Sequence, residues 1–320
     1  MVRVGCAGIV VADMICGPIE ALPQPGELLP VEDVRAKAGG CAANVAIDLA
    51  RQEIGAAVAG CVGRDAAAET PLAALRAHSV DCTGIVRSDR LPTSKTVVLL
   101  VAGEDRRYIH AFGANAEFSV GHIRRKWFDR LSVFYLGGLF VLPGIKAEEL
   151  VNLLAFCRAS GVVTVVTVVA PKPFNDHRDL ALLLPMIDYF LPNDDEARVF
   201  TGKRDPVDQA AALAAAGART PIVTCGGRGA VAAQGRQRWR CGAYDMPIVD
   251  PSGCGDAFAA GVVTGIVRGW DMARTLVYAS ALGASAVRAV GTTDGVFRAD
   301  EAEVFIAGRR LPLEEWTVAD

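Results

Sequence analysis

Val162-Val163-Thr164-Val165-Val166-Thr167-Val168-Val169 is a run of eight β-branched residues, six valines and two threonines. Apolar residues occupy both alternating faces of this run, which indicates a strand of a parallel sheet with helices covering both sides. Other β-branched runs alternate with alanine-rich stretches along the chain, as a parallel sheet with crossover helices requires. The sequence therefore predicts a doubly wound α/β domain, an αβα sandwich of three layers.

The expected elements follow from the same alternation. Strands are expected over residues 3–11, 56–62, 133–136, 162–169, 189–191 and 221–224. Helices are expected over residues 43–52, 66–78, 147–160, 206–216, 257–268, 273–290 and 300–307.

Three segments depart from this alternation. Residues 95–102 and 106–112 predict a hairpin, and residues 16–37 are too rich in proline to be helical throughout. We expect both to form a small β-sheet lid, of about residues 14–38 and 93–113, inserted in a single domain of residues 1–320. A second hairpin is expected over residues 230–233 and 237–241.

Composition restricts the class of protein. The 320 residues carry 33 Lys and Arg against 36 Asp and Glu, a net charge of −3 that argues against binding nucleic acid. The most apolar windows, residues 162–170 and 257–267, are shorter than the ~18–20 residues of a membrane-spanning helix. Residues 3–12 superficially resemble a signal peptide, but the run ends at Asp13 without a small-residue cleavage site. Nine cysteines without CxxC pairs are typical of reduced thiols in a cytoplasmic protein.

The strongest local motif is Asp250-Pro251-Ser252-Gly253-Cys254-Gly255-Asp256, which directly precedes an apolar helical run. Unpaired N–H groups at such a helix start, together with the helix dipole, would hold an anion. Asp256 would then accept a proton from an attacking hydroxyl. The alternative is structural, since Asp is also a preferred N-cap residue.

A second motif, Pro192-Asn193-Asp194-Asp195-Glu196, follows the strand expected at residues 189–191. Asn193 and Glu196 could organise Mg²⁺ around a triphosphate, because Mg²⁺ prefers oxygen ligands. The same spacing also fits a capping box, in which the two residues only begin a helix.

Two further features lie near the N-terminus. Gly39-Gly40-Cys41-Ala42-Ala43-Asn44 would let the backbone approach a ligand, with the Asn44 amide binding a hydroxyl. Alternatively, the glycine pair only ends a strand. Asp13, just after the first expected strand, lies where open α/β sheets bind ligands, or else is a solvated loop residue.

The glycine-rich segment Val223-Thr224-Cys225-Gly226-Gly227-Arg228-Gly229 follows another expected strand. It is neither a Walker A sequence nor a dinucleotide-binding motif, since the required spacings are missing. A nucleotide contact and a tight turn into the second hairpin explain its glycines equally well.

In chain order these motifs resemble the ribokinase-like (PfkB) carbohydrate kinase family, over residues 4–304. The resemblance implies an ATP-dependent phosphotransferase acting on a hydroxyl of a small sugar or nucleoside. It implies Asp256 as the catalytic base and an anion hole at Gly253, Cys254 and Gly255. The other implied roles are substrate binding by Asp13, Gly39, Gly40 and Asn44, ATP binding by Asn193, Thr224, Gly226 and Gly229, magnesium through Glu196, and a possible K⁺ site at Asp250, Ser252 and Gly291. Family lids often pair between subunits, so the resemblance also implies a homodimer through the lid.

Several residues depart from the family pattern. Cys41 replaces a common Lys, Thr167 replaces an Asp or Asn, and Gly137-Gly138-Leu139-Phe140 replaces a polar sugar contact. The sugar pocket is thus less polar than in a ribokinase. At Cys254 we expect a thiol with a lowered pKa, open to alkylation, because it begins a helix; a small buried residue is the alternative.

The substrate is ranked from the same residues. A neutral monosaccharide comes first, a nucleoside second and a phosphorylated sugar third. Tyr108, Phe112 and Phe140 could stack on a nucleoside. Arg106, Arg107 and His110 of the lid hairpin could reach an anionic group, although adjacent arginines in a hairpin are usually solvated. A non-catalytic sugar- or nucleotide-binding protein of the same fold remains an alternative.

Overall fold

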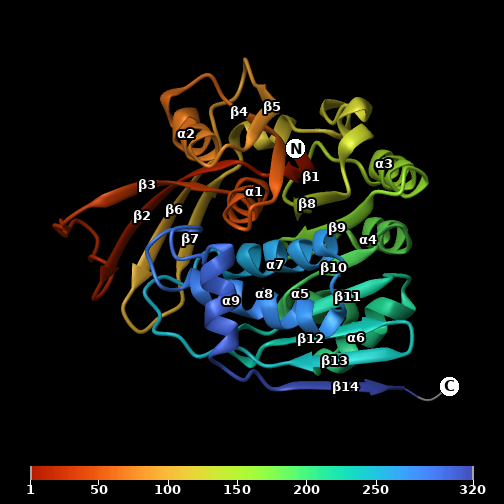
Figure 1. Cartoon of the computed structure of the whole chain (residues 1–320). Coiled ribbons are helices and arrows are strands. Elements are labelled where there is room, and N and C mark those ends of the chain that lie inside the picture. Colours follow the sequence, from red (N-terminus) through yellow and green to blue (C-terminus); the bar gives the residue numbers. More distant parts are fainter. Residues whose placement is uncertain (1, 319–320) are drawn as a thin grey trace.

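The computed structural model describes residues 2–318, which form two β-sheets and the helices around them (Figure 1). The large sheet has ten strands in the order β14-β13-β12-β11-β10-β9-β8-β1-β4-β5. Its strands are β1 (Val2–Gly8), β4 (Gly55–Val62), β5 (Asp81–Arg87), β8 (Val133–Leu139), β9 (Val163–Val168), β10 (Tyr189–Leu191), β11 (Thr220–Thr224), β12 (Ala230–Gln234), β13 (Gln237–Cys241) and β14 (Leu313–Thr317).

Strand β9, formed by the β-branched run at Val163–Val168, lies inside the large sheet between β8 and β10 and pairs with both in parallel. The strands from β5 to β11 are all parallel, and β12, β13 and β14 extend the sheet in antiparallel order. Five of the six residues of β9 are buried. The predicted strand with helices on both sides is therefore confirmed.

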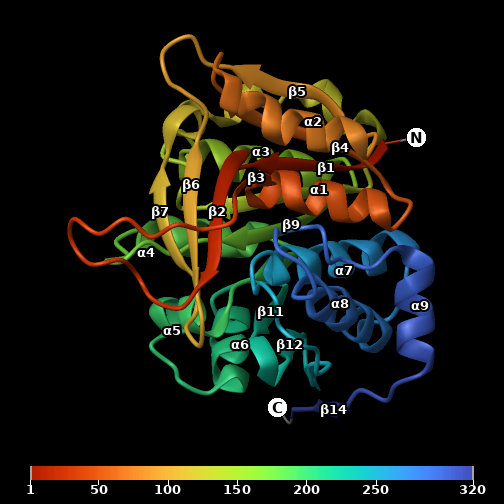
Figure 2. The ribbon, with the colours of Figure 1, turned by 90° about the vertical axis from the view of Figure 1, so that its left-hand side faces the viewer.

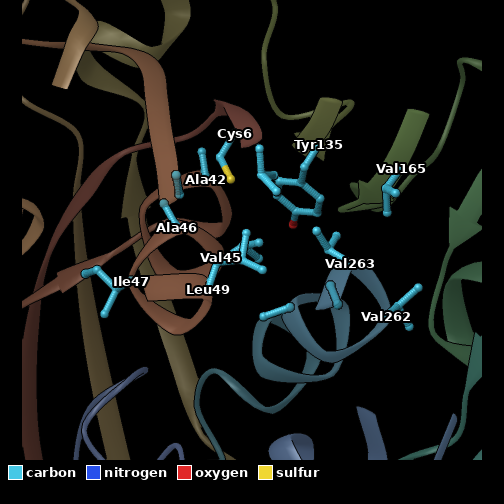
Figure 3. Close-up of a cluster of buried hydrophobic side chains, with 14 of the residues drawn as sticks. Cys6, Ala42, Val45, Ala46, Ile47, Leu49, Tyr135, Val165, Val262 and Val263 are labelled. Atoms are coloured by element: carbon cyan, nitrogen blue, oxygen red, sulfur yellow. The ribbon is translucent and has the colours of Figure 1, made fainter. Parts of the chain in front are cut away.

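Helices cover both faces of the large sheet, which makes the three layers (Figure 1). One face packs against α1 (Cys41–Arg51), α2 (Glu69–Ala77), α7 (Cys254–Arg268) and α8 (Met272–Ala286), and the other against α3 (Ala147–Ala159), α4 (His177–Leu183), α5 (Asp194–Thr201) and α6 (Pro206–Ala215). Helix α9 (Ala299–Ala307) packs on α8. Figure 3 shows part of the first core, where side chains of α1 meet Val262 and Val263 of α7 beneath Tyr135 of β8. The predicted doubly wound α/β sandwich is confirmed.

The small sheet has four strands in the order β3-β2-β6-β7: β3 (Val34–Gly39), β2 (Val11–Ile19), β6 (Lys95–Val101) and β7 (Arg107–Ala111). It stands to one side of the large sheet, with a long loop between β2 and β3 (Figure 2). Both the hairpin of β6 and β7 and the antiparallel pair of β2 and β3 agree with the expected small sheet.

The single strand expected over residues 3–11 is wrong. The chain forms β1 up to Gly8, leaves the large sheet, and begins β2 of the small sheet at Val11. Gly8 has a φ of 139°, and a side chain there would overlap the Gly137 carbonyl of the neighbouring strand β8. A continuous apolar pattern cannot reveal such a change of sheet.

Other boundaries also differ from expectation. Helix α7 begins at Cys254 rather than at residue 257, and α8 ends at Ala286 rather than near residue 290. After α8 the Arg288 guanidinium bonds the Gly295 carbonyl and the chain turns at Gly291, whose φ is 114°. The region expected as one helix at residues 66–78 is a short 3₁₀ helix followed by α2. Strands β5 and β14 and helix α4 were not expected. Among the described residues, no helix is both long and apolar enough to cross a membrane.

Candidate active site

The start of helix α7 is an open donor site. Its N-cap residue is Gly253, at a φ of 81°, where a side chain would overlap the Thr292 carbonyl. No side chain caps the helix, and the first turn closes with the Ala257 N–H donating to the Gly253 carbonyl at 2.9 Å. A Cβ on Gly255 would meet open space. The N–H groups of this first turn are therefore free to hold an anion.

Asp256 is the third residue of α7, so the interpretation of Asp256 as a simple N-cap is wrong. Its Oδ2 accepts a hydrogen bond of 2.7 Å from Asn44 Nδ2 of α1. Burial raises the pKa of Asp256 above its ordinary value, while hydrogen bonds from Asn44 and the Cys41 thiol and the charge of Arg106 lower it. Two helix starts, of α1 and α7, thus converge on one carboxyl.

Asn44 is held in turn by Thr292, which the sequence analysis did not single out. The Thr292 hydroxyl lies 2.8 Å from Asn44 Oδ1 and 3.0 Å from the Ala38 carbonyl oxygen. An oxygen facing the hydroxyl leaves the amide nitrogen of Asn44 facing Asp256. The sequence gives one sign that Thr292 belongs to the site, which is that it directly follows Gly291 of the possible K⁺ site.

Asp13 lies in strand β2 of the small sheet rather than in a loop after the first strand, and it is buried rather than solvated. A side chain on Gly39 would overlap its carboxylate, and this explains one glycine of the pair. Gly40, at a φ of 92°, is the N-cap of α1. Burial, then the charges of Asp256 and Asp250, raise the pKa of Asp13 to about 6, against a hydrogen bond from Thr96. Asp13 therefore lies close enough to Asp256 for the two charges to interact.

Asp250, Ser252 and Gly291 also come together. The fully buried Asp250 carboxylate accepts hydrogen bonds of 2.9 Å from the Ser252 N–H and the Gly291 N–H. The buried Ser252 Oγ has no hydrogen-bond partner among the described residues. These atoms form a compact, oxygen-rich loop beside the start of α7.

Asn193 and Glu196 form the capping box that the sequence allowed. Asn193 Oδ1 accepts from the Glu196 N–H at 2.8 Å, and Glu196 Oε2 accepts from the Asn193 N–H at 2.9 Å, at the start of α5. Burial raises the pKa of Glu196 to about 7, although N–H groups of Asn193 and Ala170 lower it. The Glu196 charge also raises the pKa of Cys41, so α5 and the start of α1 share one region.

The glycine-rich segment lies next to this helix start. Thr224 forms a β-bridge with Asn193, and its N–H donates to the Pro192 carbonyl at 3.0 Å. Gly226 begins a 3₁₀ turn and Gly229 has a φ of 90°, where a side chain would overlap the Cys241 carbonyl. The tight turn into the second hairpin is confirmed, and it leaves Gly226 facing open space.

The expectation of a lowered pKa at Cys254 is wrong, and the alternative of a small residue withdrawn from solvent agrees with the structure. Its thiol donates a hydrogen bond of 3.0 Å to the Pro251 carbonyl, and burial raises its pKa to about 11. The charge of Arg106 lowers this pKa, but by less than burial raises it. Burial, together with the charges of Asp250 and Asp256, therefore outweighs the charge of Arg106 and the backbone hydrogen bond that lower this pKa.

The two arginines of the lid hairpin differ. Arg107 is half exposed and pairs with Glu104, as expected for a solvated hairpin residue. Arg106 is 27 % exposed, hydrogen bonds the Tyr108 hydroxyl and Asp105, and carries the charge that acts on Cys254 and Asp256. The solvated interpretation is thus wrong for Arg106. His110 bonds Thr96, and burial lowers its pKa.

The ends of β8 and β9 beside Cys41 offer few polar groups to a ligand. Tyr135 of β8 is fully buried (Figure 3). Its hydroxyl lies 2.7 Å from Thr167 Oγ1 of β9. A Cβ on Gly137 would approach Cys41 Cβ to 2.7 Å and the Tyr135 hydroxyl to 2.9 Å. The tyrosine and threonine hydroxyls satisfy each other, so this side offers mainly a thiol and glycine backbone.

A helix start with free N–H groups, a carboxyl beside it and a glycine turn on a doubly wound sheet are the arrangement expected of a small-molecule kinase. The chain belongs to the pfkB family of carbohydrate kinases, whose model matches residues 2–298. It is an ATP-dependent phosphotransferase that acts on a sugar hydroxyl.

Individual proteins extend the likeness along the chain. A ribokinase of Haemophilus influenzae is 25 % identical over 289 residues, 88 % of this chain and 92 % of that one. An adenosine kinase of Saccharomyces cerevisiae is 26 % identical over 283 residues, 83 % of this chain and 82 % of that one. Among solved structures, a putative ribokinase II of E. coli in complex with ATP and Mg²⁺ superposes with a TM-score of 0.83 at 22 % identity, covering 97 % of this chain and all of that one.

Proposed function

We propose that the chain transfers the γ-phosphoryl group of ATP to a hydroxyl of a small neutral monosaccharide, with Asp256 as general base. The observation that carries this proposal is the place of Asp256 in the first turn of an uncapped helix. The base and the anion-holding N–H groups then belong to one rigid element. An acceptor hydroxyl beside Asp256 is also beside the phosphoryl group that it attacks.

The proposed reaction is a single displacement. Asp256 takes the proton of the acceptor hydroxyl, the hydroxyl oxygen bonds to the γ-phosphorus, and the bond to the β–γ bridging oxygen breaks to release ADP. The N–H groups of Gly253, Cys254 and Gly255 stabilise the charge on the transferred group. Asn44 keeps Asp256 oriented and ionisable, while Asp13 and the backbone of Gly39 and Gly40 bind other hydroxyls.

Nucleotide binding is assigned to the other half of the space. Asn193 caps α5 and Thr224 ends β11 beside it, while Gly226 and Gly229 belong to the turn after β11, where a Cβ on Gly226 would meet open space. The oxygen donors of Asn193 and Glu196 suit Mg²⁺, which prefers hard oxygen ligands and keeps several waters. A bound Mg²⁺ would neutralise phosphate charge there.

A monovalent cation such as K⁺ fits the loop of Asp250, Ser252 and Gly291. The supporting observation is the buried Ser252 Oγ, which has no hydrogen-bond partner among the described residues and lies beside a fully buried carboxylate. These residues would hold the cation and so fix the loop that leads into α7.

The small sheet is proposed to act as a lid and a dimer contact. The face of this sheet opposite Asp13 exposes large apolar side chains, those of Val34, Val97 and Ile109, which are 46 %, 38 % and 66 % exposed. A second lid would cover them in a homodimer. The nine free cysteines fit a reducing, cytoplasmic location.

A sugar acid or phosphorylated sugar is the second candidate substrate class, and Arg106 favours it. Its side chain is 27 % exposed, and its charge lowers the pKa of Cys254 and of Asp256 at the start of α7. Arg106→Ala should then raise KM for anionic sugars at least ~10-fold, while the matched variant Arg107→Ala leaves it unchanged. Equal KM values in the two variants would leave the neutral monosaccharide as the substrate class.

The test of the proposed function is ADP release measured over neutral sugars, sugar acids, sugar phosphates and nucleosides, with and without K⁺. Turnover should appear with one sugar class and fall ~10²–10⁴-fold in Asp256→Asn, the scale of a lost general base. ATP binding, measured by calorimetry, should persist in that variant. ATP binding without turnover on any compound would favour a binding protein instead.

A further inference from the structure

Asp48 is a buried carboxyl that the proposed reaction does not use. It lies on helix α1, one turn beyond Asn44, and is 0 % exposed. Neither of its carboxyl oxygens has a hydrogen-bond partner among the described residues. Such a group is rare inside a protein, because a buried charge is normally paired or hydrogen-bonded.

Asp48 is the middle member of a polar stripe on α1. Asn44, Asp48 and Gln52 are spaced four residues apart and so lie on one face of the helix. At one end Asn44 holds Asp256; at the other Gln52 donates to the Phe297 carbonyl and accepts from the Tyr278 hydroxyl at 2.6 Å. Both ends are satisfied, and only the middle carboxyl lacks partners.

The charged and titratable groups on this side of α1 are few. Helix α7 contributes Asp256, and Arg268, which bonds the Gln52 carbonyl; α8 contributes Tyr278, which bonds the Gln52 side chain. On α1 itself Arg51 bonds the Val296 carbonyl. None of these groups hydrogen bonds the Asp48 carboxyl, and the two whose charges act on it are Asp256 and Arg51.

The charge state of Asp48 follows from these surroundings. Without donors to receive it, a carboxylate is strongly disfavoured here and the neutral acid is retained. Burial raises the pKa of Asp48 well above its ordinary range, the Asp256 charge raises it further, and Arg51 offsets part of this.

We propose that Asp48 is a positioning residue that stores one proton behind the catalytic base, so that Asp48 and Asp256 titrate as a coupled pair in which Asp256 carries the negative charge. The coupling is reciprocal, since two carboxylates in one low-dielectric region cannot both ionise freely. Ionisation of Asp48 at high pH adds a negative charge behind the site that must stabilise transferring phosphoryl oxygens. The catalytic part of this inference rests on the proposed function; the proton on Asp48 does not.

The first test needs no substrate. The pKa of Asp48 is higher in the folded chain than in the unfolded chain, where it is roughly 3.9. Its contribution to the free energy of unfolding is therefore complete below the unfolded pKa and is lost as pH rises toward the folded pKa. Asp48→Asn is neutral at every pH. The difference in Tm between this variant and the wild type (variant minus wild type) should therefore increase from pH 5 to pH 8. For Asp48→Ala the difference should increase in the same way, although its value at pH 5 is not the same.

The matched control is Glu53→Gln, which removes an exposed carboxyl just beyond the end of α1. Its Tm should follow that of the wild type at every pH. A Tm difference between Asp48→Asn and wild type that does not change with pH would overturn the proposal. Asp48 would then bind the same number of protons in the folded chain as in the unfolded chain.

The second test is the pH profile of kcat/KM. In Asp48→Asn the acid limb, set by Asp256, should stay in place, and the alkaline limb should move up by about one pH unit or more, the scale of a coupled pair. A downward shift of the acid limb by about a unit would mean that Asp48 is already ionised, and an unmoved alkaline limb would remove its catalytic role. If the wild type had no kinase activity, the proposed function would fail while the Tm series still decided where the proton lies.

Discussion

The hydrogen bond between Asn44 and Asp256 should set the pH at which the enzyme starts to work. In Asn44→Ala, Asp256 loses a hydrogen bond of 2.7 Å that lowers its pKa. A hydrogen bond to a charged group contributes about 1.5–3 kcal/mol, and one pKa unit corresponds to about 1.4 kcal/mol. The pKa of Asp256, already raised by burial, should therefore rise by a further one to two units or so.

Because Asp256 must be ionised to act, the acid limb of kcat/KM should move to higher pH by that amount. Measuring kcat/KM from pH 5 to 9 separates this shift from any uniform loss caused by weaker sugar binding, which lowers the whole curve without moving it. Asn152→Ala, which removes an exposed asparagine of α3 in the opposite helix layer, should leave the limb in place. An acid limb that does not move in Asn44→Ala would show that this hydrogen bond does not tune the base.

Three further predictions follow from single contacts. Gly39→Ala places a methyl group on the Asp13 carboxylate, so it should lower Tm by several degrees and raise KM for the sugar at least ~10-fold, whereas a stable variant with unchanged KM would contradict the placement of Asp13. Cys254, whose pKa is raised to about 11, should react slowly with iodoacetamide at pH 7.5 and roughly ten times faster for each pH unit up to about 10, as followed by peptide mass spectrometry; full labelling within minutes at pH 7.5 would disagree. Ile109→Asp on the exposed face of β7 should convert a dimer to monomers in sedimentation experiments, and Arg107→Ala on the same strand should not; an unchanged dimer would place the contact elsewhere.

The layered fold could be predicted from local pattern because each buried strand and each helix face leaves its own periodic signal. Strand β9 agrees with the expected run to within one residue at each end. The prediction of a single strand over residues 3–11 is wrong for a different reason. After Arg3 the residues of this run are apolar or glycine, but the chain leaves the large sheet at Gly8, where a side chain would overlap the Gly137 carbonyl of a strand more than 120 residues away.

The candidate site shows the same division. The motifs around Asn44, Asn193 and Asp256 were visible because helix starts and glycine turns have local sequence requirements. The bond of Asn44 with Asp256 joins residues 212 positions apart, and that of Asn44 with Thr292 joins residues 248 apart, so neither leaves a local pattern. Arg106 and Arg107 are chemically identical neighbours, and only the structure shows that the charge of Arg106 acts on Cys254 and Asp256 while Arg107 pairs with Glu104.

The crossing of the chain at Gly8 has a thermodynamic consequence. Val10, between the two sheets, is bonded on both its N–H and its carbonyl by the buried side chain of Asn115, at 3.2 and 3.1 Å. Asp13 lies three residues further on in the small sheet, while Asp256 and Asn44 belong to the helix layer. A sugar that contacts both Asp13 and Asp256 would bind only when the small sheet and the large sheet are in one relative position. Sugar affinity and the equilibrium between relative positions of the two sheets would then be linked by a single coupling free energy. Loosening the Asn115 bonds would then weaken sugar binding without touching the sugar.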